Sequence, residues 1–384
     1  MIKNNNLVQK FGIHQIKIFV GCLLVFVASG ISMTSTIFTG YTPHHRCQVP
    51  DCEANNTNYY SNMDNGNKSL PGFYDGEMIE ADNECVIPQY KIDPDGHCYE
   101  ARFMGPNLEE CDGNQLVVDR TIVSSTLVED FGYLCDSGRM AIFLSLSHNS
   151  GKLFGSIIFG WISDKYGRLK GLIMAILTMS LSGIGGIFIG GKIGAVVYLV
   201  LRFLSGAGAV GSYIVAFVLS VEHIRNVEIG IFLNLFYAVG ESLLGLEAFL
   251  IRDWRYLQLL AYSPMLILIG LYQLIPESPR WLRCNGKGEE AEDIFEKADN
   301  ESSCKGKNNN RNRFYRMNSI EEKILSKEVN ATIFDAFQHE EMLFRTFNMG
   351  LQWFSVTSNY HGLSYISTSL SGTVTQIRRK FEMR

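Results

Sequence analysis

Residues 160–168 read Gly-Trp-Ile-Ser-Asp-Lys-Tyr-Gly-Arg, and they stand between two long apolar stretches at about 140–162 and 171–190. About 20 apolar residues are enough for a helix to cross the hydrocarbon core of a bilayer. The charged, glycine-bearing link is therefore typical of a short turn between two membrane-spanning helices. This stretch predicts an all-α membrane protein.

The apolar pattern continues on both sides of this turn. Six stretches run approximately over 18–38, 140–162, 171–190, 194–221, 230–251 and 256–275. The first is longer than the apolar part of a secretory signal peptide, about 7–15 residues, so we interpret it as a retained helix. We therefore expect a six-helix bundle, with transmembrane helix 1 at 18–38 and transmembrane helices 2–6 within 140–275.

Charge placement predicts the orientation. Lys3, Lys10 and Lys17 precede the first span, so residues 1–17 are expected to be a cytoplasmic N-terminus. The loop at 163–170 then lies on the cytoplasmic side, and its three basic residues, Lys165, Arg168 and Lys170, agree with the positive-inside rule. Short links on the other side carry only Lys192 in one, and Arg252 and Arg255 in the other.

Residues 39–139 form a long polar insertion that the same orientation places outside the cell. Six cysteines lie in it, which favours an oxidising compartment and disulfide bonds; the alternative is six free thiols in a cytosolic loop. Sequence does not choose among the pairings. Asn55 and Asn67 begin two glycosylation sequons. The candidate disulfide cysteines are Cys47, Cys52, Cys85, Cys98, Cys111 and Cys135.

The C-terminal third is more polar. Residues 276–345 are expected to form a cytoplasmic loop, with a short amphipathic helix near 289–297. Residues 346–371 are either a transmembrane helix 7 that needs neighbours or an interfacial segment, because aromatic residues there are mixed with many hydroxyls. Residues 372–384 form a divergent basic tail.

Composition excludes several classes of function. The chain has 46% hydrophobic and 19% charged residues and a net charge of −5, so no large basic surface for nucleic acid is implied. We find no nucleophile–base set, metal-ligand spacing or phosphate loop, so we expect no enzyme, no metal and no cofactor.

The turn at 160–168 resembles the signature loop of the major facilitator superfamily; the alternative is an ordinary positive-inside turn. In the superfamily its acidic residue helps hold one conformation, which the resemblance assigns to Asp164, with Arg168 beside it. Gly160, Lys165 and Gly167 complete the signature. Leu169 departs from it, because a second basic residue is usual there.

A second motif narrows the family. The run Pro-Glu-Ser-Pro-Arg-Trp-Leu at 276–282 resembles a signature of the organic cation/anion/carnitine transporter family, the solute carrier family 22-like transporters. Sugar porters carry a similar run but lack a long cysteine-rich first outer loop. The segments 133–136, 249–258 and 360–364 also resemble the organic ion family, although His361 stands where a second tyrosine is usual.

The resemblance implies a cluster of charges at the cytoplasmic end of the bundle. Ion pairs that form in only one conformation bias a two-state equilibrium. One departure is Ile229, which occupies a position where the family usually has a basic residue. The expected gating cluster is Asp164, Arg168, Glu222, Glu277 and Arg280.

Substrate contacts are expected from charged and aromatic residues within the spans. An intramembrane charge is a functional candidate by default. For Arg202 the alternative is that it snorkels to the outer interface, and for Glu247 it is an outer position in water. The substrate-cavity candidates are Tyr237, Glu241, Trp353, Tyr360 and Arg202.

The resemblance implies a carrier of small organic ions, whether organic cations, carnitine-like compounds or organic anions, that works by alternating access between two six-helix halves. This chain then supplies the N-terminal half, with the C-terminal half missing. The alternatives are a sugar-porter-like carrier, and a non-transporting half-carrier that regulates or binds a partner. The expected partners are the lipid bilayer, a small organic ion, and a full-length carrier or second copy, in the plasma membrane.

Overall fold

A computed structural model gives the fold as two units, residues 1–306 and 307–384. Nearly all of the helical bundle is described, together with short strands of the long insertion and one helix of the second unit. The described residues are 13–43, 45–47, 73–74, 77–78, 85–87, 90–92, 98–100, 109–110, 116–118, 120, 123–223, 228–272, 275–294, 340–359 and 362.

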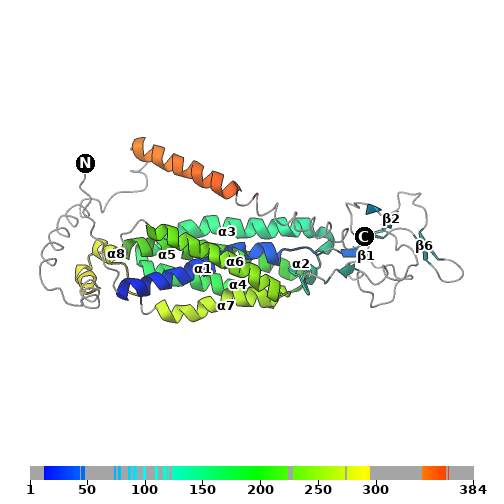
Figure 1. The fold of residues 1–384 in the computed structure, drawn as a ribbon, viewed down its shortest axis with the longest axis horizontal. Helices are drawn as coiled ribbons and strands as arrows, with labels where there is room; N and C mark the ends of the chain where they lie inside the picture. Colours follow the sequence, from blue (N-terminus) through cyan, green and yellow to red (C-terminus); the bar gives the residue numbers. More distant parts are fainter. Residues whose placement is uncertain are drawn as a thin grey trace. The chain divides into compact units, whose positions relative to one another are not determined.

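Long helices that run side by side make up the first unit (Figure 1). Two short helices, α2 (Leu127–Asp130) and α8 (Pro279–Cys284), accompany them, and a further helical turn covers 288–294. The long helices are α1 (Ile13–Thr39), α3 (Ser137–Tyr166), α4 (Arg168–Gly185), α5 (Gly191–His223), α6 (Glu228–Leu250) and α7 (Trp254–Tyr272).

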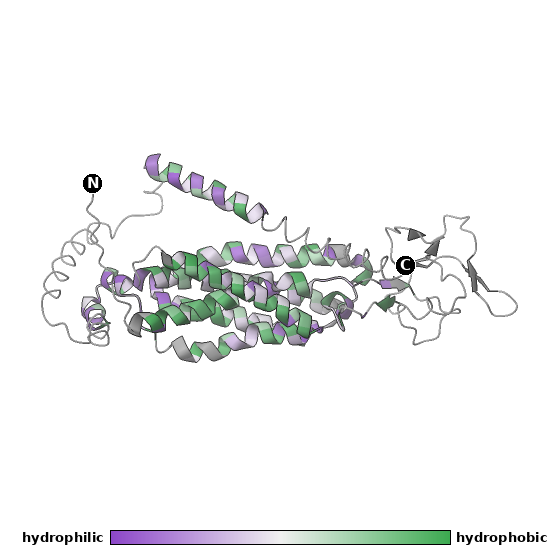
Figure 2. Ribbon diagram, viewed as in Figure 1, coloured by the Kyte–Doolittle hydropathy of each residue, from purple (hydrophilic) through white to green (hydrophobic). Residues whose placement is uncertain are grey.

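These helices agree in place with the six predicted spans, and most of them extend further. Apolar residues cover much of their surface (Figure 2). Within the described residues, four segments are long and apolar enough to cross a membrane, namely Ile16–Thr39, Arg168–Phe188, Gly194–His223 and Ile229–Leu250. The helices α3 and α7 are not among these four. A full set of six spans therefore stays a prediction.

The helix α5 is central to the bundle, with its most extensive contacts to α3 and α4. Its glycines make these contacts close, because a Cβ at Gly208 would lie 2.5 Å from the backbone nitrogen of Met179 in α4. Gly206 lies against His148 of α3 in the same way. Small residues let helices approach where lipid gives no hydrophobic drive between them.

The described residues of the insertion between α1 and α2 form four antiparallel strand pairs, which the sequence did not predict. The pair closest to the bundle in sequence joins His45 to Val118 and Cys47 to Leu116. The pairs are β1 (His45–Cys47) with β8 (Leu116–Val118), β2 (Phe73–Tyr74) with β3 (Glu77–Met78), β4 (Val86–Ile87) with β7 (Glu109–Glu110), and β5 (Tyr90–Ile92) with β6 (Cys98–Glu100).

The second unit contributes one described helix, over 340–359. It begins before the expected 346, and its side chains are exposed almost throughout. Apolar and polar residues alternate along it (Figure 2). The prediction of a seventh span at 346–371 falls partly outside the described residues.

Candidate functional site

Arg168 is the centre of a charge cluster at one end of the bundle. One guanidinium nitrogen, Nη1, donates to Asp164 Oδ1 and, at 3.1 Å, to Ser163 Oγ. The other, Nη2, donates to Glu222 Oε1 at 3.3 Å. The side chains of Arg168 and Glu222 are only 17% and 11% exposed, so salt screens this pair less than a surface pair. The contacts join α3, α4 and the end of α5.

Glu277 caps the first turn of α4. Its Oε1 accepts hydrogen bonds from the backbone N–H of Leu169 at 3.0 Å and of Ser278 at 2.9 Å. The first N–H groups of a helix have no partner within it, and a negative charge there is favourable. Gly167 precedes the helix with a φ of +120°, and a side chain at this position would meet the Glu277 carboxylate.

The helix α8 is held against the turn between α3 and α4. Ser278 is its N-cap and accepts from the backbone N–H of Trp281 at 3.3 Å. The indole Nε1 of Trp281 donates to the backbone carbonyl of Asp164 at 2.7 Å. We call Asp164, Arg168, Glu222, Glu277 and Trp281 the Arg168 cluster.

The structure brings together four of the five predicted gating residues and leaves out Arg280, which was expected among them. Arg280 is exposed, because the neighbouring Trp281 points toward α3 and successive helical residues point about 100° apart. Glu277 was expected to take part in ion pairs. Its carboxylate instead accepts hydrogen bonds from the backbone amides of Leu169 and Ser278. Within the signature turn, a Cβ at Gly160 would meet nothing within 4 Å. Lys165 stacks on Trp161 and Tyr166, 4.7 Å and 5.3 Å from their ring centroids.

Arg202 lies inside the bundle. This position excludes the alternative that Arg202 snorkels to the outer interface, and it means that the side chain does not line an open cavity. It is 2% exposed. Its Nη1 donates to Tyr262 Oη at 3.0 Å and to Ser35 Oγ at 3.2 Å. Ser205 also donates to Tyr262 Oη, at 3.0 Å. Hydroxyls from α1 and α7 thus accept hydrogen bonds from this guanidinium, and Ser205 of α5 bonds to one of them, so these contacts connect three helices.

Lys152 is a candidate that the sequence analysis missed, although a lysine in the middle of an apolar stretch is a visible signal. Its Nζ donates to the backbone carbonyl of Met33 in α1 at 3.4 Å. Two predicted cavity residues lie close by on α6. Tyr237 donates from its hydroxyl to Met33 Sδ at 3.4 Å, and a Cβ at Gly30 of α1 would lie 3.3 Å from the backbone nitrogen of Glu241.

The other two cavity candidates belong to the second unit. Trp353 is 62% exposed on the helix over 340–359. Tyr360 lies outside the described residues. Their predicted place in the substrate cavity, on the side of the seventh helix, therefore stays a prediction.

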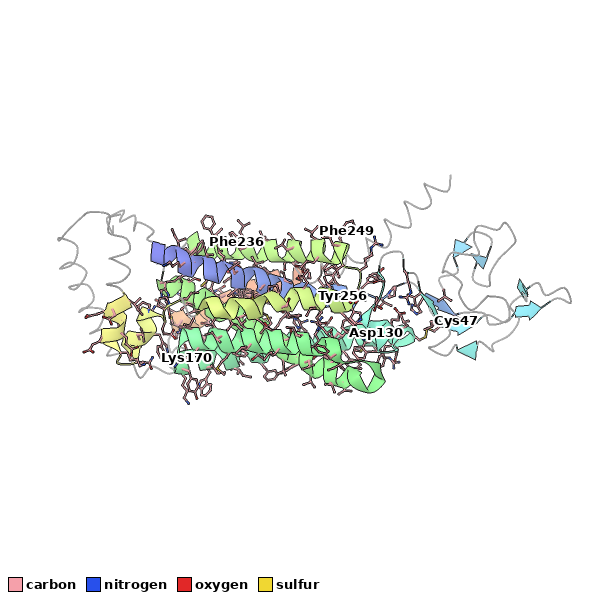
Figure 3. All side chains as sticks on the ribbon, turned by 90° about the horizontal axis from the view of Figure 1, so that it is seen from below. Cys47, Asp130, Lys170, Phe236, Phe249 and Tyr256 are labelled. Atoms are coloured by element: carbon pink, nitrogen blue, oxygen red, sulfur yellow. A yellow bond between two sulfur atoms is a disulfide. The ribbon has the colours of Figure 1, made fainter. Side chains whose placement is uncertain are left out.

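The insertion carries a disulfide between Cys85 and Cys135, and Cys47 is also disulfide-bonded. Cys98 lies in β6, and Cys52, Cys111, Asn55 and Asn67 lie outside the described residues. The end of the insertion is attached to α7, because Asp130 accepts from Trp254 Nε1 at 2.8 Å and from Arg255 Nε at 3.1 Å. Asp130 and Lys170 mark opposite ends of the bundle in Figure 3.

Comparisons with known proteins lead to transporters and not to enzymes. The model of a family described as "Sugar (and other) transporter" matches residues 112–376. The organic cation transporter protein of Drosophila melanogaster is 26% identical over 381 residues, and human organic cation/carnitine transporter 2 is 28% identical over 366 residues. The beta-alanine transporter of Drosophila melanogaster is 28% identical over 390 residues. These names confirm the predicted resemblance to the organic cation/carnitine transporters.

The alignments cover most of this chain and a smaller part of each relative. They include 94%, 91% and 95% of this chain, but only 64%, 62% and 63% of the three relatives in the same order. Among solved structures, the xylose transporter XylE from E. coli in a partially occluded, inward-open conformation is 15% identical, with a TM-score of 0.48. That match covers 83% of this chain and 59% of XylE.

Proposed function

Because the chain belongs to the sugar (and other) transporter family, we propose that it transports small organic ions across a membrane by alternating access. The names of its relatives support this substrate class, since organic cations, carnitine and beta-alanine are all small organic ions. The predicted sugar-porter alternative has no comparable support among those names.

The observation that carries the proposal is the Arg168 cluster. It links the end of α3, the start of α4, the end of α5 and α8 through side chains that are far apart in sequence. Charged contacts of this kind can form in one conformation of a carrier and break in the other, which sets the balance between the two states. The cluster then stabilises one conformation of the transport cycle.

The proposed arrangement in the membrane follows the charge pattern. The N-terminus, the turn at 163–170 and the segment 276–345 lie in the cytoplasm, and the disulfide-bearing insertion lies outside. All six long helices cross the plasma membrane. Support comes from the two ends of the bundle, one with Lys170 near the Arg168 cluster and the other with Asp130 near the insertion (Figure 3).

Uptake by cells that express the chain tests this function. Labelled tetraethylammonium, carnitine and hippurate serve as cation, zwitterion and anion, and surface biotinylation gives the amount at the membrane. We expect uptake of at least one probe above mock-transfected cells. Uptake at mock level with normal surface expression would refute transport, and co-purification with a full-length relative would then favour the regulatory alternative.

A variant tests the role of the cluster. Arg168→Gln removes the ion pair with Glu222, worth about 1 kcal/mol, so we expect the balance of states to shift about fivefold and the initial uptake rate to change. Lys170→Gln is the matched control, because Lys170 is exposed in the same helical turn. If both variants transport like the wild type at equal surface levels, the cluster does not gate the carrier.

A further inference from the structure

The disulfide between Cys85 and Cys135 joins two parts of the chain that are 50 residues apart. Cys135 lies in the single helical turn Leu134–Asp136, directly before α3. Cys85 directly precedes β4, which lies beside β1. The bond therefore fastens the strands of the insertion to the end of the bundle at which α3 begins.

The two sulfurs of this disulfide differ in access. Cys135 is exposed, whereas Cys85 is partly buried. In thiol–disulfide exchange a thiolate attacks one sulfur and the other sulfur leaves, so access to each sulfur matters. Asp136 and Arg139 follow Cys135 and pair with each other at 3.4 Å, which leaves little net charge to repel a thiolate. Access therefore favours attack on Cys135, with Cys85 as the leaving sulfur.

A buried histidine contacts the leaving sulfur. His45 is 4% exposed, and its Nε2 lies 3.6 Å from Cys85 Sγ. Its Nδ1 lies 3.0 Å from the carbonyl oxygen of Pro43. A disulfide sulfur and a carbonyl oxygen have no proton to donate. The two contacts therefore suit an imidazolium, which donates from both ring nitrogens.

An imidazolium beside Cys85 makes that sulfur a better leaving group. Cleavage leaves the electron pair of the S–S bond on Cys85, and a neighbouring His⁺ stabilises the resulting thiolate. A thiol that is stabilised as its anion leaves faster in exchange. Cys47 offers a contrast in the same insertion, because it is also disulfide-bonded but is only 6% exposed.

We propose that the Cys85–Cys135 disulfide is a thiol-exchange site for small-molecule thiols, with His45 assisting the departure of Cys85. The attacking thiol loses its proton to solvent and forms a bond to Cys135 Sγ. The Cys85–Cys135 bond breaks, and its electron pair goes to Cys85 Sγ, which takes a proton from His45 Nε2 that solvent then returns. A second thiol displaces the first from Cys135. In total, two thiols become one small-molecule disulfide, and the protein disulfide becomes two thiols.

The position of the first adduct tests the direction of attack. The full chain in nanodiscs is exposed briefly to reduced glutathione, free thiols are trapped with N-ethylmaleimide, and mass spectrometry of peptides locates both labels. We expect glutathione on Cys135 and maleimide on Cys85 of the same molecule. We also expect this disulfide to open at least about tenfold faster than Cys47 becomes labelled, because a buried sulfur is shielded from attack.

The variant His45→Gln separates chemical assistance from packing. Glutamine keeps a hydrogen-bond donor but carries no charge, so we expect reduction of the Cys85–Cys135 disulfide to slow about tenfold. If His45 only packs the insertion, its loss would loosen the fold and make reduction faster. Glu129→Gln is the matched control and should keep the wild-type rate, because Glu129 pairs with Arg120 at 2.6 Å in the segment that precedes Cys135.

Three results would each overturn the site. They are glutathione found on Cys85 as often as on Cys135, opening of the Cys85–Cys135 disulfide no faster than labelling of Cys47, and a rate in His45→Gln that equals or exceeds the wild-type rate. The first two are measured on the wild type, so they decide the matter even if the variant does not fold. Uptake is not measured, so failure of the transport proposal and failure of this site are distinguishable.

Discussion

Replacing Glu277 with glutamine removes the charge that caps α4 while keeping the size of the side chain. In the wild type, Oε1 accepts from Leu169 N–H at 3.0 Å and from Ser278 N–H at 2.9 Å, and Oε2 also lies 3.2 Å from Leu169 N. Glutamine has one acceptor oxygen, and its amide group would turn donors toward the helix N-terminus. Losing the favourable charge and one charge-assisted hydrogen bond should lower the free energy of unfolding by about 1–2 kcal/mol.

Denaturant unfolding of the purified protein in detergent micelles measures this loss. Trp281 gives a local signal, because its indole is bonded to the carbonyl of Asp164 and should become more exposed when α8 separates. Glu292→Gln is the matched control, since Glu292 is exposed in the next helical turn. If Glu277→Gln stays within about 0.5 kcal/mol of wild type, as surface substitutions do, the capping argument is wrong.

Three further predictions concern the network around Arg202, the insertion and the Arg168 cluster. Tyr262→Phe removes the hydroxyl that accepts hydrogen bonds from Arg202 and Ser205 at 3.0 Å each, and it should lower the free energy of unfolding by about 1–3 kcal/mol. The control Tyr256→Phe changes an exposed tyrosine and should not lower it, so equal losses in the two variants would contradict the network. Cys85→Ser and Cys135→Ser should each destabilise the insertion by about 2–4 kcal/mol in chemical denaturation, because each removes the Cys85–Cys135 disulfide. The double variant should show no further loss, and additive losses would argue against this disulfide. Arg168→Gln should reduce the unfolding free energy by about 1 kcal/mol, more than Arg280→Gln does, and the reverse order in the detergent assay would count against the position of Arg280.

Much of the candidate site was predictable from motifs. The turn at 160–168 and the run at 276–282 are local patterns, and the structure brings Asp164, Arg168, Glu222 and Glu277 to one end of the bundle. The exposed position of Arg280 was not predictable, because one residue of difference along a helix changes the direction of a side chain by about 100°. Lys152 could have been found as a lysine within an apolar stretch, but its neighbours could not.

The sequence by itself determined the long helices and the turns between them, and it predicted disulfide bonds in the insertion. This information is local, because a chain in lipid must satisfy its backbone hydrogen bonds within each segment and the apolar length then marks the helix. Only the tertiary structure decided that Glu277 caps α4, that Arg202 is enclosed by hydroxyls and that Lys152 contacts the backbone of α1. These contacts depend on how each helix is rotated and how closely its neighbours pack, which arises from many weak contacts between residues far apart in the chain.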